Sequence, residues 1–147
     1  GGGSLYEPYR EAVRAAGVAD NFEFTGYVSY DELPALYRRM SLFVAPVWKE
    51  SFGQVSPFAM SMKVPVIGYD IGAIGEIVNA PELLAPPGDA EGLARIAVGL
   101  LDSPETIHRL GDAQQRRAHE NFSIQAMIAN YARIYAEVSD KARKDFA

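Results

Sequence analysis

The chain has 147 residues, of which 48% are hydrophobic and 22% are charged. This balance is typical of one soluble globular domain with its own core, and it excludes a disordered or low-complexity protein. The net charge of -5 argues against attraction to nucleic acid or anionic lipid, and the absence of cysteine excludes disulfides and thiolate metal sites. No apolar run is long enough to cross a bilayer. We therefore expect a cytoplasmic domain with no transmembrane segment and no nucleic-acid partner.

The first predicted element is a helix that ends at Gly17, a residue type common at helix C-termini. Ser4 and Glu7 have the spacing of a capping box at its start, and apolar residues follow at helical intervals. Asn21–Thr25 then alternates between polar and apolar residues like a short strand. The chain is thus predicted to begin with a helix and a strand.

A second helix is predicted after this strand. Ser29 and Glu32 again have capping-box spacing, whereas Pro34 would fit better in a helix that starts near Asp31. The start of this helix is therefore set only to within about two residues.

Two nearly continuous apolar runs, Ser41–Val47 and Val64–Tyr69, are typical of strands that are covered on both faces. The residues between them suffice for one helix. A strand, a helix and a second strand in this order predict a parallel crossover. Leu83–Ala85 is a third, shorter strand candidate.

The last third of the chain is predicted to be helical. Asp89, Ser103 with Pro104, and Ser123 each begin a helical stretch with N-cap chemistry. Alternating strands and helices argue for an open α/β sheet, and no repeat or linker divides the chain. We therefore predict a single domain over residues 1–147, a Rossmann-like parallel sheet flanked by helices.

Ligands of open parallel sheets bind beyond the carboxyl ends of the strands. Two loops occupy that position here, within Pro46–Met60 and Tyr69–Val78. In the first loop, Gly53 permits close backbone approach, and a helix that begins near Val55 would direct free N–H groups at a phosphate. Glu50 beside that anion site would accept hydrogen bonds from sugar hydroxyls.

Simpler interpretations of the same residues stay open on this evidence. A lone loop glutamate such as Glu50 is usually only solvated. Glu76 lies in the first turn of a helix, where the helix dipole stabilises an acid with or without a ligand. Gly72 and Gly75 could simply permit a tight turn.

The order of these pieces resembles a known family, the retaining GT-B glycosyltransferases of family 4. That family has a strand ending in proline, an acidic residue before a Phe-Gly pair, a helix with Ala-Met, a Pro-Val pair and a glycine-rich turn ending in glutamate. The residues that match are Pro46, Glu50, Phe52, Gly53, Ala59, Met60, Pro65, Val66, Gly72, Gly75 and Glu76. Similar pieces at Phe22–Val28, Pro86–Asp89 and Phe122–Ser123 extend the likeness over nearly the whole chain.

The resemblance implies roles for particular residues. Glu50 would be the catalytic-site residue that contacts the hydroxyls of the donor sugar. The other donor-binding residues would be Ser51, Phe52, Gly53, Gln54, Val55, Gly72 and Glu76, several of them through backbone N–H groups, with Tyr27 and Val28 against the nucleotide base.

Two residues depart from the family pattern. The family's second glutamate, which accepts hydrogen bonds from the ribose, falls at Phe58, and a phenyl ring cannot accept them. Phe58 is most simply interpreted as a packing residue. The glycine that usually ends this helix falls at Lys63, where a left-handed conformation costs about 1 kcal/mol.

The resemblance also implies which parts have no counterpart in this chain. These are the first two strands of the family's C-terminal domain, which carry a Lys and an Arg for the diphosphate, and the N-terminal acceptor domain. The chain would thus be a GT-B C-terminal domain lacking its first strands, which binds a nucleotide diphosphate sugar. The Ser41–Val47 strand would have a bare edge, so we expect self-association of the fragment or altered strand pairing there.

Two alternatives to sugar transfer stay open. One is a non-catalytic binding or interaction module of the same fold, which Phe58 favours. The other is a different nucleotide-sugar enzyme, such as an epimerase, because a fold does not fix a chemistry.

Three further residues are interpreted structurally. Trp48, next to an apolar strand, is expected in the core, whereas His108 and His119 in polar helical stretches are expected on the surface. No Asp-x-Asp pair or other cluster of oxygen or imidazole ligands occurs in the sequence. We therefore predict no bound metal and no cofactor.

Overall fold

The computed structural model describes residues 3–145, and their side chains as far as residue 141. Contacts within the chain divide it into two units, Gly1–Leu36 and Tyr37–Ala147, and each is described by itself below. Such a division is no test of independent folding, so the single partial domain over residues 1–147 stays a prediction.

In the first unit, helix α1 spans Tyr6–Ala15. The predicted capping box is wrong, because Leu5 holds the N-cap position without a side-chain hydrogen bond. Glu7 instead pairs with Arg10 at 3.1 Å, one turn further along the helix. Gly17 has a φ of +71°, the left-handed conformation that was expected where this helix ends.

The predicted strand Asn21–Thr25 does not form. A short 3-10 helix, η1, covers Ala19–Asn21, and Phe22 after it is extended, but residues 22–25 pair with no strand in the described part of the chain. An extended segment becomes a strand only where a neighbour supplies ladder hydrogen bonds. Phe24 is held by packing instead, since its ring meets the Tyr6 ring edge-on at a centroid distance of 5.8 Å.

Helix α2, Leu33–Tyr37, follows a turn that begins at Ser29. The predicted contact between Ser29 and Glu32 is confirmed: the Ser29 hydroxyl donates to Glu32 Oε2 at 2.7 Å and the Ser29 N–H donates at 3.2 Å. These two hydrogen bonds, the hydroxyl first, lower the pKa of Glu32. The helix itself begins at Leu33, four residues after Ser29.

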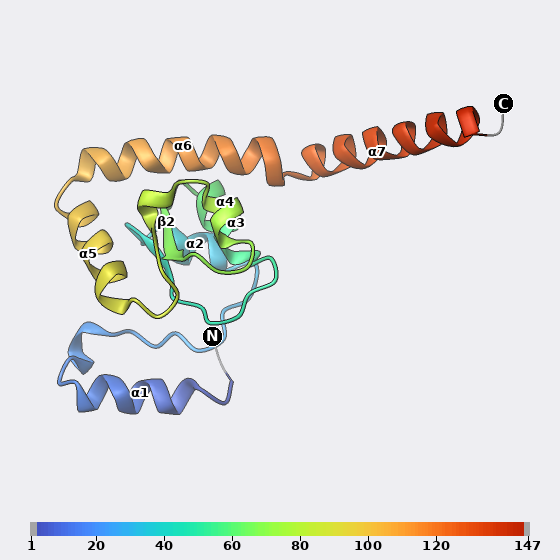
Figure 1. The fold of residues 1–147 in the computed structure, drawn as a ribbon. Coiled ribbons are helices and arrows are strands. Elements are labelled where there is room, and N and C mark those ends of the chain that lie inside the picture. The colour runs from blue at the N-terminus through green and yellow to red at the C-terminus, as the bar shows by residue number, and fades with distance from the viewer. Residues whose placement is uncertain (1–2, 146–147) are drawn as a thin grey trace. The chain divides into compact units, whose positions relative to one another are not determined.

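The second unit contains a three-stranded parallel sheet in the order β1-β2-β3 (Figure 1). The strands are β1 Phe43–Ala45, β2 Val66–Tyr69 and β3 Leu84–Ala85. Each lies within the apolar run that predicted it and is shorter than that run. Pairing of Val44 with Ile67 confirms the predicted parallel crossover. β1 is an edge strand and Val44 is 44% exposed, but self-association through this edge stays a prediction.

Helices account for most of the second unit. They are α3 Val55–Ser61, α4 Ile74–Val78, η2 Pro81–Leu83, α5 Ala90–Leu101, α6 Pro104–Phe122 and α7 Ile124–Asp145. The predicted cap at Asp89 is confirmed by its bond from the Gly92 N–H at 2.8 Å, and that at Ser123 by a bond from the Ala126 N–H at 3.1 Å. The helical C-terminal third is thus confirmed.

The core of this unit lies between β2 and the helices α3, α4 and α6. All four residues of β2 are buried, and Met60, Ile74 and Ile77 from the two short helices are almost fully enclosed. The long helix α6 packs along α3 (Figure 1). Lys63, at the end of α3, has a φ of +61°, which confirms the left-handed conformation expected where the family has glycine.

The buried side chain of Gln114 joins α6 to the central strand. Its Oε1 accepts from the Val66 N–H at 2.7 Å, and its Nε2 donates to the Val66 carbonyl at 3.2 Å. β3 pairs with β2 only from Gly68 onward, so Gln114 takes the place of a neighbouring strand at Val66. One amide thus satisfies both backbone groups of a buried residue.

We predict that Gln114→Leu lowers the free energy of unfolding by roughly 2–4 kcal/mol, because two buried backbone groups lose their partners. Gln115→Leu is the matched control, since Gln115 donates to the Ser61 carbonyl at a partly buried position. Urea unfolding of both variants gives the comparison. Equal losses in the two variants would contradict the strand-like role of Gln114.

Candidate functional site

The two loops singled out from the sequence lie against each other. Gly72 has a φ of +54°, and a Cβ added there would collide with the backbone carbonyl oxygen of Glu50. Gly53 has a φ of +76°, and its Cα packs between the Glu50 side chain and Ile74, which a Cβ would approach to 3.0 and 3.1 Å. Glycine at both positions therefore lets the loop after β1 and the loop after β2 meet at Glu50.

The Glu50 carboxylate is held by the next residue in the chain. Its Oε1 accepts a hydrogen bond from the Ser51 N–H at 2.9 Å, and the side chain is partly exposed. One carboxylate oxygen is thereby oriented, while the other can accept hydrogen bonds from a ligand.

The start of α3 supplies backbone donors next to Glu50. The N-cap residue, Gln54, makes no side-chain cap. The Ser56 N–H is bonded to the Gly53 carbonyl at 2.9 Å, and Pro57 has no N–H. Gln54 and Val55, both exposed, have N–H groups to which no other described residue is hydrogen-bonded.

Glu76 lies in the first turn of α4 and its side chain is exposed. Its backbone carbonyl accepts from Arg117 Nη2 at 2.6 Å, so the backbone of this residue is anchored to α6. Ser51 and Phe52 are also exposed, which leaves them accessible to a ligand. The ligand contacts of all these residues stay predictions.

Tyr27 and Val28 belong to the first unit. The Tyr27 side chain is 80% exposed, and Val28 is partly buried. Their predicted contact with a nucleotide base stays a prediction.

The prediction that Trp48 is in the core is wrong. Its side chain is 68% exposed, with its ring centroid 6.1 Å from that of Tyr69 and its edge against Gly88. A tryptophan that follows a strand can be buried in the core or can lie exposed near the strand end. The apolar run in the sequence does not distinguish these two positions. The two histidines, His108 and His119, are exposed as expected.

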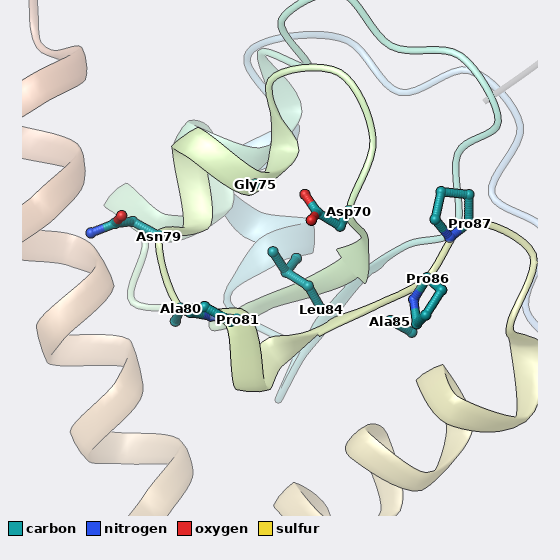
Figure 2. Close-up of a pocket in the computed structure, with 9 residues that line it drawn as sticks. All are labelled: Asp70, Gly75, Asn79, Ala80, Pro81, Leu84, Ala85, Pro86 and Pro87. Carbon is teal, nitrogen blue, oxygen red and sulfur yellow. The ribbon is translucent and has the colours of Figure 1, made fainter.

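A cavity of about 510 Å³ lies at the β3 side of the sheet (Figure 2). Its lining residues are Asp70, Gly75, Asn79, Ala80, Pro81, Leu84, Ala85, Pro86 and Pro87. None of them is a predicted donor-binding residue, and the single charged side chain among them is the Asp70 carboxylate, which stands over Leu84 in Figure 2. A lone carboxylate repels phosphate, so this cavity does not suit a diphosphate.

A second cavity, of about 530 Å³, borders the start of α3 and contains two predicted donor-binding residues, Phe52 and Gln54. Phe58 lines it as well. The Phe58 ring meets the Tyr37 ring edge-on at 5.1 Å, and Tyr37 in turn stacks on Phe43 at 5.7 Å. Phe58 thus packs as the sequence suggested, with one side of its ring open to the cavity.

Because Phe58 packs against the buried ring of Tyr37, we predict that Phe58→Glu lowers the free energy of unfolding by roughly 2–3 kcal/mol through the lost ring contact and the poorly solvated charge. Phe58→Leu is the control, which keeps an apolar side chain and should cost less. Calorimetry with and without nucleotide measures the melting temperature and the nucleotide binding of each variant. An unchanged melting temperature with tighter nucleotide binding would mean that residue 58 faces the ligand.

Residues of α6 that contact both loops were not singled out from the sequence. Arg117 binds the end of α4, and the Phe122 ring meets the Phe52 ring edge-on at 5.9 Å. The one sequence signal was the Phe122–Ser123 correspondence to the family, which placed the start of the last helix without indicating a contact. No group of three or more His, Cys, Asp or Glu side chains that could hold a metal occurs among the described residues.

The parallel sheet has two loops that meet beyond the carboxyl ends of β1 and β2, which is where open α/β proteins bind their ligands. The family model of the glycosyl transferases group 1 matches residues 1–103, and the chain belongs to this family, whose fold is GT-B. A family of sugar-transferring enzymes is thus identified from the sequence, the fold and the comparison together.

Curated relatives carry glycosyltransferase names. The chain is 39% identical over 99 residues to the 2-deoxystreptamine N-acetyl-D-glucosaminyltransferase of Streptomyces fradiae, covering 66% of this chain and 24% of the relative. It is 30% identical over 131 residues to the MMP alpha-(1->4)-mannosyltransferase of Mycolicibacterium hassiacum, covering 87% of this chain and 32% of the relative. The chain therefore spans about a quarter to a third of the length of these relatives.

Solved structures agree with the fold. Sucrose-phosphate synthase from Thermosynechococcus elongatus superposes with a TM-score of 0.80 at 28% identity, covering 92% of this chain and 35% of that one. The C-terminal domain of a group 1 glycosyl transferase from Francisella tularensis superposes with a TM-score of 0.72 at 24% identity, covering 82% of this chain and 63% of that one.

None of the described helices is long and apolar enough to span a membrane.

Proposed function

We propose that this chain is the donor-binding part of a retaining glycosyltransferase, which moves a sugar from a nucleotide diphosphate sugar to an acceptor. The observation that carries the proposal is the contact of the two loops at Glu50. A partly exposed carboxylate with one oriented oxygen packs against Gly53, and the next two residues, Gln54 and Val55, are exposed and have N–H groups without a partner among the described residues. The carboxylate suits sugar hydroxyls and the amides suit diphosphate oxygens, so the pair matches both halves of such a donor.

In the proposed reaction, the bond between the anomeric carbon and the diphosphate oxygen breaks. Negative charge develops on the leaving diphosphate as this bond breaks, and backbone N–H groups with fixed positions stabilise it. The acceptor oxygen bonds to the same carbon on the same face, and its proton passes to the leaving diphosphate. Glu50 would hold the sugar ring in place through its hydroxyls while the bond breaks.

We further propose that the acceptor is held by a domain outside this chain, the N-terminal domain of the same enzyme. The surface of α7 supports this proposal. Seven large apolar side chains on this helix are about half exposed or more: Ile124, Met127, Ile128, Tyr131, Ile134, Tyr135 and Val138. They repeat at intervals of three and four residues and form one apolar stripe, a surface that usually packs against another part of a protein.

Ligand-observed NMR on the full-length protein, with UDP, GDP, ADP and TDP sugars as probes, tests the proposal. Binding of one nucleotide sugar, followed by its consumption when acceptors are added, is the expected result. Binding without any turnover would favour a non-catalytic module, and conversion of the bound sugar to its epimer would favour an epimerase. Binding of none of the probes would overturn the proposal.

A further inference from the structure

Arg117 of α6 binds the C-terminal end of α4. Its Nε donates to the Ile77 carbonyl at 2.8 Å and its Nη2 donates to the Glu76 carbonyl at 2.6 Å. α4 has only five residues, so most of its carbonyls have no partner within the helix. A cation at this end satisfies these carbonyls and complements the helix dipole.

The same guanidinium also contacts the last residue of α6. The Arg117 Cζ lies 5.9 Å from the centroid of the Phe122 ring, and the Phe122 ring meets Phe52 edge-on at 5.9 Å. Phe52 belongs to the loop after β1, next to Glu50. One end of α6 thus contacts both loops: Arg117 holds the loop after β2 through α4, and Phe122 holds the loop after β1 through Phe52.

The two loops and the short helices that follow them are not held in place by their own hydrogen bonds alone. The helices α3 and α4 that follow the loops have seven and five residues, and neither has a side-chain N-cap. Helices of this length are not stable alone in water, so their positions depend on tertiary contacts. The contacts from α6 include Gln115, which donates to the Ser61 carbonyl at the end of α3 at 2.9 Å.

We infer that Arg117 and Phe122 are positioning residues for the donor site, because they fix the loops after β1 and β2 relative to each other. The inference rests on the proposed function for its effect on turnover. Arg117 acts on the backbone of Glu76, and Phe122 acts on the ring of Phe52. Loss of Arg117 frees α4 to rotate and weakens the support of Phe122, whereas loss of Phe122 frees the Phe52 loop alone.

Hydrogen exchange of the full-length protein without ligand tests the inference independently of activity. Arg117→Ala should speed amide exchange about tenfold in 72–79 and at Ser56 and Phe58, whose N–H groups bond to the loop carbonyls of Gly53 and Gln54, with no change in β2, as expected for local opening. Phe122→Ala should speed exchange at Ser56 and Phe58 only. Arg116→Ala is the matched control, because Arg116 lies on the same helix with an exposed side chain.

Steady-state kinetics give the second readout. Arg117→Ala should raise the KM for the donor about tenfold, a size typical for lost charge-assisted hydrogen bonds, and leave the KM for the acceptor within about twofold. Arg117→Lys keeps the charge and one donor, and should recover part of the loss.

Unchanged exchange in 72–79 and at Ser56 and Phe58 of Arg117→Ala would overturn the inference. Equally fast exchange in residues 64–69 would overturn it as well, since Arg117 would then stabilise the whole unit and not the loops. A wild-type protein that binds no nucleotide sugar would refute the proposed function, and the exchange comparison would still decide the roles of Arg117 and Phe122.

Discussion

Replacing Glu50 by glutamine should lower the rate of sugar transfer at least about 100-fold, since each hydrogen bond to a charged group contributes roughly 1.5–3 kcal/mol and a sugar offers more than one hydroxyl. The amide oxygen of glutamine can still accept from the Ser51 N–H, so the loop should keep its shape. Binding of free nucleoside diphosphate should change less than about threefold, because the carboxylate meets the sugar and not the phosphates. Initial rates on the full-length enzyme measure the transfer, and titration calorimetry measures the binding of the nucleoside diphosphate.

Glu82→Gln is the control for this substitution, because Glu82 is exposed on η2 and lies outside both loops. It should leave transfer and nucleotide binding as in the wild type. Normal transfer by Glu50→Gln would remove Glu50 from the site. A loss of nucleoside diphosphate binding equal to the loss of transfer would place the carboxylate near the phosphates, against the proposed arrangement.

Much of the second unit could be predicted from its sequence, because local signals and tertiary packing agree there. The apolar runs that became β1 and β2 are separated by a helix-sized segment, which leaves a parallel crossover as the natural connection. Asp89 and Ser123 cap helices in the way their positions suggested. The left-handed conformation of Lys63 was implied by the family resemblance, because the family has a glycine at the end of this helix.

The errors arise where a partner decides the outcome. Asn21–Thr25 alternates like a strand, yet an alternating segment needs a neighbouring strand, and none among residues 3–145 pairs with it. Ser4 has the chemistry of a cap, but the helix begins after Leu5 and Glu7 pairs with Arg10. Local sequence cannot tell which of these competing contacts wins.

The candidate site was predicted only in part, for a related reason. Glu50 and the glycines around it are close in sequence to recognisable turns, and the structure brings the two loops together at Glu50. Arg117 lies in a polar helix 41 residues after Glu76, and its partners are backbone carbonyls, which leave no trace in the sequence. Contacts of this kind become visible only in the folded chain.

The contact between the two loops can be tested at Gly72. Alanine there would adopt a left-handed conformation at a cost of roughly 1–2 kcal/mol, and its Cβ would also collide with the Glu50 carbonyl oxygen. The collision is with backbone, so it cannot be relieved by turning a side chain. The loops would have to separate at this contact, which would shift the backbone of Glu50 and its carboxylate with it.

We therefore predict that Gly72→Ala lowers donor-dependent transfer at least about 100-fold, since a misplacement of about 1 Å can cost that much, while most of the fold is retained. Gly75→Ala is the control in the same loop, because its Cβ would meet only the end of the Asp70 side chain, which can move aside. Initial rates, together with the unfolding free energy of both variants, give the comparison. Equal activity in the two variants would show that close contact between the loops at Gly72 is not needed, whereas loss of folding in Gly72→Ala would show that the contact supports the whole unit and not the site alone.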